Sequence, residues 1–240
     1  MSTDFLTSLI PVSYLELWNN YLKFVDLGKR RFFYENNKIS IKEEKLRLLE
    51  KAIRRDLPVS DNILSRLQQS FLRENLSVSL LSDWLIVWHY TAMLPTPLNE
   101  KRLSDIIGYA ASPIARMILV LNNENLSIYL PFSSFVSAVL LVSMEIEKSV
   151  MLKNTKWSRK QKCAKLNGWL KNSRILLNVI RSKKLKFKTA LILNKLKIYV
   201  QLLQNNKQCK IGFLDEIRIF LYSIWQFMTI RYKSVAIRGV

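Results

Sequence analysis

The sequence predicts an all-α fold of eight to ten helices, in one domain over residues 1–240. Apolar residues recur at helical spacing along nearly the whole chain. Five glycines and six prolines are too few for the many tight turns of an all-β sandwich or barrel. No stretch alternates apolar and polar residues as a half-buried strand does. With 49% hydrophobic residues, the chain can bury a core.

Helices are predicted over 15–27 and 40–55. The first carries Leu15, Trp18, Leu22 and Val25 on one face. The second begins with Ser40, which can cap a helix N-terminus, and its outer face is charged.

Three further helices are predicted before residue 122. One follows Ser60. The next, 82–94, is apolar nearly all round and therefore central, and prolines at 95 and 97 end it. The stretch 99–121 holds one helix, or two with a kink at Pro113.

The remaining predicted helices are 133–152, 159–181, 186–204 and 213–232. The last three repeat apolar residues at i, i+3 and i+4, which is the spacing of one buried face. Leu166, Leu170 and Leu177 show it in the first of these.

The start of the chain has neither a basic n-region nor a long apolar run, so no signal or transit peptide is predicted. The uncharged stretch 125–144 contains Pro131, and its apolar part is shorter than the roughly 20 residues of a spanning helix. A buried core helix is predicted there. We expect a cytoplasmic protein without a transmembrane helix, peripheral at the inner membrane.

The positive charge is concentrated in the C-terminal third. The formal net charge is +20. Residues 1–150 hold 17 Lys and Arg against 16 Asp and Glu, whereas residues 151–240 hold 21 against 2. A basic excess of this size indicates a nucleic acid, an anionic membrane or an acidic protein as partner.

Common catalytic motifs are missing. The glycines are isolated, so there is no P-loop or dinucleotide-binding loop. His89 lies in an apolar stretch without an acidic neighbour and is predicted to be a core residue. Cys163 and Cys209 lack a partner histidine, which favours ordinary packing and a reducing compartment over catalysis or a disulfide.

The stretch 103–121 reads LSDIIGYAASPIARMILVL. Its Tyr, small residues and Pro resemble the squalene/phytoene synthase family, and the order of predicted helices is similar over most of the chain. The resemblance implies an all-α fold and a prenyl pocket lined by Tyr109, Ala111, Pro113 and Ala115. Read without the resemblance, Tyr109 suits core packing equally well, and Arg116 suits a solvated or acid-paired residue.

Enzymes of that family join two prenyl diphosphates head to head, with Mg²⁺ held by two aspartate-rich motifs. The first motif would fall at 26–35, where Lys29 or Arg31 replaces a leading Asp and Glu35 is a candidate metal-binding remnant. Cations at this place repel Mg²⁺. Arg30 and Arg31 are candidate diphosphate contacts.

The second motif would fall at 142–151. Glu145 and Glu147 are the candidate metal-binding remnants there, and Met151 takes the partner position of Glu147. A solvated helix edge is the alternative interpretation of both glutamates. No metal ligand is therefore assigned, and Mg²⁺ is expected only if the chain is active.

Three hypotheses follow. The first is a divergent family member without prenyl transfer activity, a binding or assembly factor near a membrane, like the mitochondrial complex I assembly factor that carries such a domain. Its basic third would dock on an anionic membrane or an acidic protein, and a prenyl lipid could bind its pocket. The second is an active transferase in which Glu35, Glu145 and Glu147 hold Mg²⁺.

The third hypothesis is a basic RNA-binding protein. Trp157 is interleaved with basic residues of the stretch 157–174, an arrangement that suits RNA. No RNA-binding motif accompanies it, which disfavours nucleic acid.

Overall fold

The computed structural model confirms the all-α prediction. It describes residues 4–29, 39–54, 62–94, 99–146, 157–205, 216–217 and 219–224. Over these residues the chain forms ten α-helices and two 3-10 turns, η1 (Val12–Tyr14) and η3 (Leu126–Ile128), and no strand. Residues 216–217 and 219–224 are also helical.

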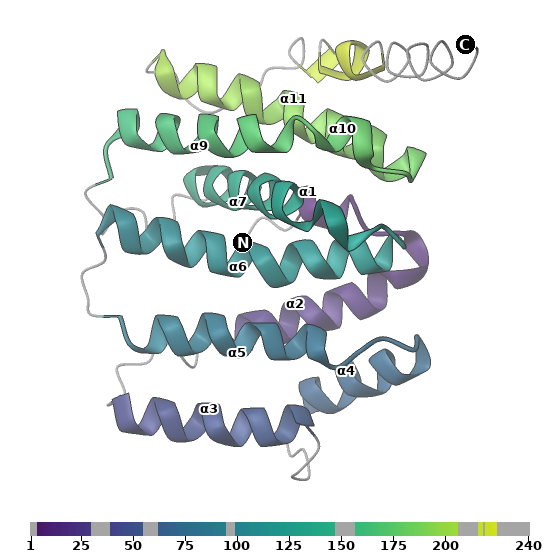
Figure 1. The fold of residues 1–240 in the computed structure, drawn as a ribbon, viewed down its shortest axis with the longest axis vertical. Helices are drawn as coiled ribbons and strands as arrows, with labels where there is room; N and C mark the ends of the chain where they lie inside the picture. Colours follow the sequence, from purple (N-terminus) through teal and green to yellow (C-terminus); the bar gives the residue numbers. More distant parts are fainter. Residues whose placement is uncertain are drawn as a thin grey trace.

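Six helices form a single stack (Figure 1). In order along the stack they are α3 (Ile39–Arg54), α5 (Ser79–Ala92), α6 (Glu100–Leu121), α7 (Tyr129–Ile146), α9 (Arg159–Ser173) and α11 (Lys183–Gln204). Each packs against the next one in this order. The charged helix α3 therefore lies at one end, and the basic helices α9 and α11 lie at the other.

The remaining helices cover the sides of this stack. α2 (Leu15–Lys29) packs on α4 (Asn62–Arg73) and on α5. α10 (Leu176–Val179) packs on α11, and α1 (Asp4–Thr7) reaches α7 in the middle of the stack (Figure 1).

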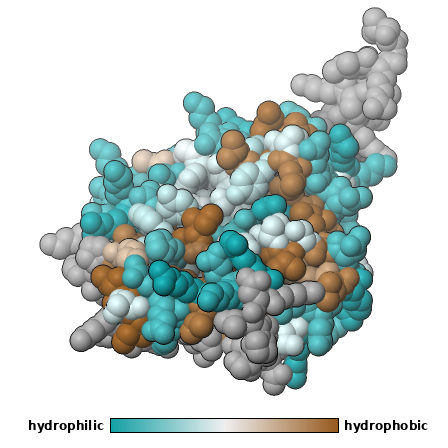
Figure 2. All heavy atoms as spheres, turned by 60° about the horizontal axis from the view of Figure 1, so that its bottom comes forward, coloured by the Kyte–Doolittle hydropathy of each residue, from teal (hydrophilic) through white to brown (hydrophobic). Residues whose placement is uncertain are grey.

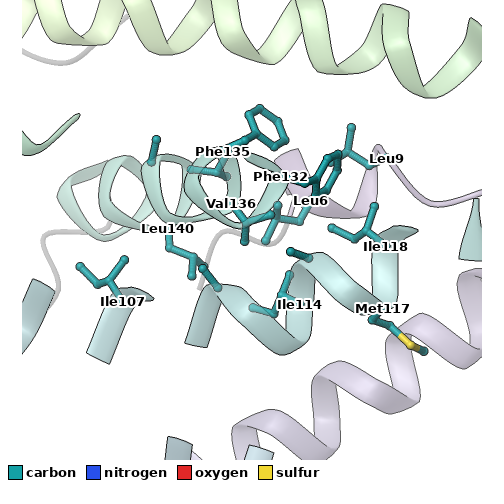
Figure 3. Close-up of a cluster of buried hydrophobic side chains, with 14 of the residues drawn as sticks. Leu6, Leu9, Ile107, Ile114, Met117, Ile118, Phe132, Phe135, Val136 and Leu140 are labelled. Carbon is teal, nitrogen blue, oxygen red and sulfur yellow. The ribbon is translucent and has the colours of Figure 1, made fainter. Parts of the chain in front are cut away.

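One continuous hydrophobic cluster runs from Leu6 to Leu203. Its centre lies between α6, α7 and the α1 segment, where side chains of all three meet (Figure 3). Ile118, Phe132 and Phe135 in this region are completely buried. Burial of apolar surface at about 25 cal/mol per Å² is the main force that holds such layers together.

Aromatic side chains join α2 to α5. The Trp84 indole nitrogen donates a 2.7 Å hydrogen bond to the buried Tyr21 hydroxyl. Trp84 stacks on Trp88, with ring centroids 5.8 Å apart, and Phe24 meets Trp88 edge-on at 5.0 Å. The two helices approach closely at Gly28, where a Cβ atom would lie 2.1 Å from the Trp88 ring.

Side-chain caps fix the start of three helices. Asn99 accepts the Arg102 N–H at the start of α6. Ser158 and Gln161 form a reciprocal capping box at the start of α9. Ser182 accepts the Leu185 N–H, which explains why α11 begins three residues before the predicted 186.

Two prolines lie inside helices. α6 is one helix through Pro113, so the alternative of two helices is not realised. α7 begins at Tyr129, earlier than the predicted 133, and includes Pro131. Pro131 is tolerated because it lies in the first turn of α7, where the backbone N–H groups have no intrahelical partner.

Two helical stretches, Glu100–Leu121 and Leu126–Ile146, are long and apolar enough to cross a membrane by length and composition. In each, 61% of the apolar window is buried inside the fold. They pack on one another in the centre of the stack, which is the position predicted for the uncharged stretch 125–144.

Exposed apolar side chains also occur at the α3 end. Ile39 and Leu48 of α3 and Leu72 of α4 are more than half exposed. Figure 2 turns this end of the molecule forward and shows brown apolar patches separated by hydrophilic residues. Apolar residues scattered in this way are normal on a protein surface.

Candidate functional site

Glu145, a candidate metal ligand, is paired with a lysine. It lies near the end of α7, and its Oε1 is 2.5 Å from Lys162 Nζ on α9. Both side chains are less than one fifth exposed. The ammonium group neutralises the carboxylate and would repel a metal cation beside it.

The other proposed metal and diphosphate contacts, Glu35, Glu147, Arg30 and Arg31, lie outside the described residues. Among the residues that the structure does describe, no group of three or more His, Cys, Asp or Glu side chains could hold a metal ion. Within that part of the chain, the donor set does not fit Mg²⁺, which prefers several carboxylate oxygens.

A surface groove of about 440 Å³ lies between α5, α6 and the start of α7. Most of its wall is apolar, and Asp83 and Arg116 are the charged residues in its lining. The lining residues are Asp83, Ile86 and Val87 from α5; Tyr109, Ser112, Pro113 and Arg116 from α6; and Leu126 and Tyr129 from η3 and α7.

Two of the four predicted pocket residues line this groove and two do not. Tyr109 and Pro113 are in the lining. Ala111 and Ala115 are completely buried in the hydrophobic core, so their assignment to a pocket wall is corrected. On α6, positions 109, 112, 113 and 116 share one face, whereas 111 and 115 turn towards the core.

Arg116 is held by Asp83 across the two helices. Its Nη1 donates to both carboxylate oxygens of Asp83, at 2.8 and 3.1 Å. Nη2 lies 3.5 Å from the Ser79 hydroxyl, which is at the limit of a hydrogen bond. About 30% of each charged side chain remains exposed.

A further tyrosine, Tyr90 of α5, lies next to the groove residue Tyr109. The rings of Tyr90 and Tyr109 lie 4.8 Å apart. The Tyr90 hydroxyl is 3.4 Å from Asp105, and the pKa of Tyr90 is raised mainly by burial and then by this carboxylate. His89, predicted to be a core residue, is exposed, because α5 turns it away from its neighbours α3 and α6.

The second candidate site is the basic layer, which we define as residues 157–205. This segment contains thirteen Lys and Arg and no Asp or Glu. Cations from α9 and from the start of α11 are exposed, among them Lys160, Lys165, Lys171 and Lys184. Because α9 packs on α11, these cations share one end of the stack (Figure 1).

Burial, and after it the nearness of other cations, lowers the pKa of two lysines in the basic layer. Burial and the nearby Arg174 lower the pKa of Lys197. Burial and Lys184 lower the pKa of Lys188 in the same way. Two lysines of the layer are neutralised by carboxylates from elsewhere, through the pairs Lys162–Glu145 and Lys195–Glu216.

An apolar surface lies beside the basic layer. Ile217, Phe220, Leu221 and Tyr222 are 40–59% exposed. Phe220 meets Phe187 of α11 edge-on at 6.3 Å. Exposed apolar groups therefore lie next to a surface rich in lysine.

Cys163 and Trp157 are packing residues. Cys163 is buried, and burial raises the pKa of its thiol, so it is a poor nucleophile. Cys209 lies outside the described residues. Trp157 is only 4% exposed and cannot stack on a nucleic-acid base without rearrangement.

No family model matches the chain, and neither a curated protein nor a solved structure is significantly similar to it. The family resemblance of residues 103–121 therefore stays a prediction.

Sequence reasoning missed Asp83 as the partner of Arg116. Thirty-three positions separate them, and each looks like a surface charge on its own helix. Only one feature of the sequence pointed to Asp83 as a pairing residue: it is the only acid of the apolar stretch 82–94.

Proposed function

We propose that this chain is a non-catalytic helical docking protein that binds an anionic membrane surface through its basic layer. The observation that carries the proposal is a segment of 49 residues with thirteen cations and no acid. Each Lys or Arg close to an anionic bilayer contributes about 1 kcal/mol to binding.

The exposed apolar residues favour a membrane over RNA. Phe220, which contacts Phe187 of the lysine-rich helix α11, and the next residue, Leu221, are 49% and 59% exposed and suit insertion between lipid headgroups. Single-stranded RNA binds by stacking on exposed aromatic faces, and the two tryptophans of the basic layer do not offer them. Trp157 is buried, and Trp169 is half-buried under the Lys165 ammonium, which lies 5.4 Å from its ring.

We propose that the chain is not catalytic because Glu145 is already held in an ion pair. Its ion pair with Lys162 withdraws a candidate metal ligand of the prenyl transferase hypothesis. In this proposal the chain is a divergent relative of the squalene/phytoene synthases that acts as a binding or assembly factor near a membrane.

The test is co-sedimentation with vesicles of phosphatidylcholine, with and without phosphatidylglycerol. The native chain is expected to bind only the anionic vesicles, less tightly as salt rises. The triple variant Lys160→Glu, Lys165→Glu, Lys171→Glu should bind at least roughly 100-fold more weakly, because three attractive charges are reversed.

A matched control carries the same change of net charge at the other end of the stack: Arg47→Glu, Lys51→Glu, Arg66→Glu on α3 and α4. It should keep most of the affinity. Equal binding to neutral vesicles, or an equal loss in both triple variants, would contradict the proposal.

Competition with a single-stranded RNA separates the alternative partner. If RNA displaces the chain from anionic vesicles at equal anion concentration, the RNA-binding hypothesis takes precedence. Leu221→Ser tests the apolar contribution: it should weaken vesicle binding without changing its salt dependence.

A further inference from the structure

The groove between α5, α6 and α7 combines an apolar wall with an arginine whose donors are only partly used. A guanidinium group has five N–H donors. Asp83 takes those of Nη1, and the single contact of Nη2, with Ser79, is 3.5 Å long. Among the residues that the structure describes, Nε has no partner.

The groove wall next to Arg116 is suited to a hydrocarbon chain. Ile86 is 64% exposed, and Leu126 and Tyr109 are 45% and 44% exposed. All three line the same groove, so their exposed surfaces face a common space. Its volume of about 440 Å³ lies within the range of small-molecule sites.

We propose that this groove binds a carboxylate amphiphile, a fatty-acid-like molecule with one hydrocarbon chain. Its carboxylate accepts hydrogen bonds from Nε and Nη2 of Arg116. Its chain lies along Ile86, Tyr109 and Leu126. The Ser112 hydroxyl, also in the lining, lies 3.4 Å from the Ser133 hydroxyl, and it is a further donor for the carboxylate when Ser133 donates in that pair.

The carboxylate of Asp83 favours a ligand with a single negative charge. It holds Arg116 in place, but it also repels any anion that binds the remaining edge of the guanidinium group. Asp83 repels a doubly charged phosphate monoester more strongly than a singly charged carboxylate, because the repulsion grows with the charge of the ligand. The pair therefore selects a monoanion.

The test compares dodecanoate with dodecanol, below the concentration at which either self-associates, by isothermal titration calorimetry. The two probes share the chain and differ in the head group. Dodecanoate should bind more tightly by at least about tenfold, the effect of one hydrogen bond to a charged group. Equal affinities would overturn the proposal.

Two variants change dodecanoate binding in opposite directions. Arg116→Gln should weaken it by at least about tenfold, and Asp83→Asn should strengthen it several-fold because the repulsion is removed. Neither should change the affinity for dodecanol. Weaker dodecanoate binding by folded Asp83→Asn would overturn the proposal.

Arg174→Gln controls for unspecific attraction to the basic layer. This exposed arginine lies outside the groove, and its loss should leave dodecanoate binding unchanged. Dodecyl phosphate is the last probe. If it binds more tightly than dodecanoate, the groove is a phosphate site and the proposal of a monoanion is overturned. Thermal unfolding of each variant verifies that it is folded.

The experiment contains no membrane, and the groove lies outside the basic layer. Loss of vesicle binding in the triple variant and loss of dodecanoate binding in Arg116→Gln are therefore independent outcomes.

Discussion

At Gly28 the backbone of α2 lies against the indole of Trp88. A Cβ atom at this position would lie 2.1 Å from two ring carbons. Trp88 is 2% exposed and stacked on Trp84, so its ring cannot move aside. We expect Gly28→Ala to lower the free energy of unfolding by about 1–3 kcal/mol, the usual effect of overpacking.

Gly168 is the matched control for this change. It lies in α9 with open space around it, and an added Cβ atom would meet nothing within 4 Å. Gly168→Ala should stabilise the fold by about 0.5–1 kcal/mol, because alanine loses less backbone entropy in a helix. Urea denaturation measures both, and equal effects would contradict the close approach at Gly28.

Tyr21 makes stability depend on alkaline pH. Complete burial raises its pKa above the ordinary value of 10.0. The folded state therefore holds this proton after the unfolded chain has lost it. The stabilisation that comes from this raised pKa is fully present below pH 10.0. Above that pH the free energy of unfolding falls by about 1.4 kcal/mol per pH unit.

The check is urea denaturation at a series of alkaline pH values. The native chain should lose stability more steeply above pH 10.0 than Tyr21→Phe, which cannot ionise at this position. Parallel curves would show that this hydroxyl is not sequestered. Tyr21→Phe also loses the acceptor for Trp84, so the comparison concerns the slope and not the absolute stability.

Among the elements, α11 is anchored by a carboxylate from a distant loop. Glu124 follows α6 and is only 8% exposed. Its two oxygens accept the N–H groups of Ser182 and Arg181, at 2.6 and 3.1 Å. A negative charge at the N-terminus of a helix also interacts favourably with the helix dipole.

Glu124→Ala should reduce stability by about 1–3 kcal/mol, because it leaves two partly buried N–H groups without an acceptor. Hydrogen exchange should show faster exchange in the first turn of α11, while the amides of α5 stay protected. Glu124→Gln keeps one acceptor oxygen and should have a smaller effect. An unchanged exchange rate in α11 would contradict the role of this anchor.

Most helices could be predicted from the sequence because each buries one face. Apolar spacing predicted α2 to within two residues of its observed end, and it predicted a helical stretch over 99–121, where α6 spans Glu100–Leu121. The short helix α1 was missed, because four residues carry no periodic signal. The break at Arg174 inside the predicted helix 159–181 was missed because apolar spacing continues across it.

The candidate site was less predictable than the helices. Tyr109 and Pro113 were found as pocket residues, but the groove also needs Ile86, Leu126 and Asp83 from other elements. Local periodicity shows which residues of one helix share a face. It does not show which helices become neighbours, and this determines where the groove forms.

At the scale of the whole molecule, the basic layer should make stability increase with salt. Its exposed cations repel one another, and dissolved ions screen this repulsion. We expect sodium chloride to raise the melting temperature by about 2–4 °C, which corresponds to about 1 kcal/mol in a chain of this size.

Differential scanning fluorimetry over a salt series measures this effect. The α9 triple variant should respond less to salt than the native chain, since its reversed charges attract the remaining cations. The α3–α4 triple variant should respond like the native chain. A melting temperature that falls with added salt would show that ion pairs outweigh repulsion.

The position of the N-terminal segment also bears on how the chain is made. Leu6 and Leu9 are buried against Phe132 and Ile118, over a hundred residues later in the sequence (Figure 3). At 5–20 residues per second, the ribosome needs roughly 6–24 s to produce these partners. During that interval the side chains of Leu6 and Leu9 lack these apolar partners, and transiently exposed apolar surface of this kind promotes aggregation before the fold is complete.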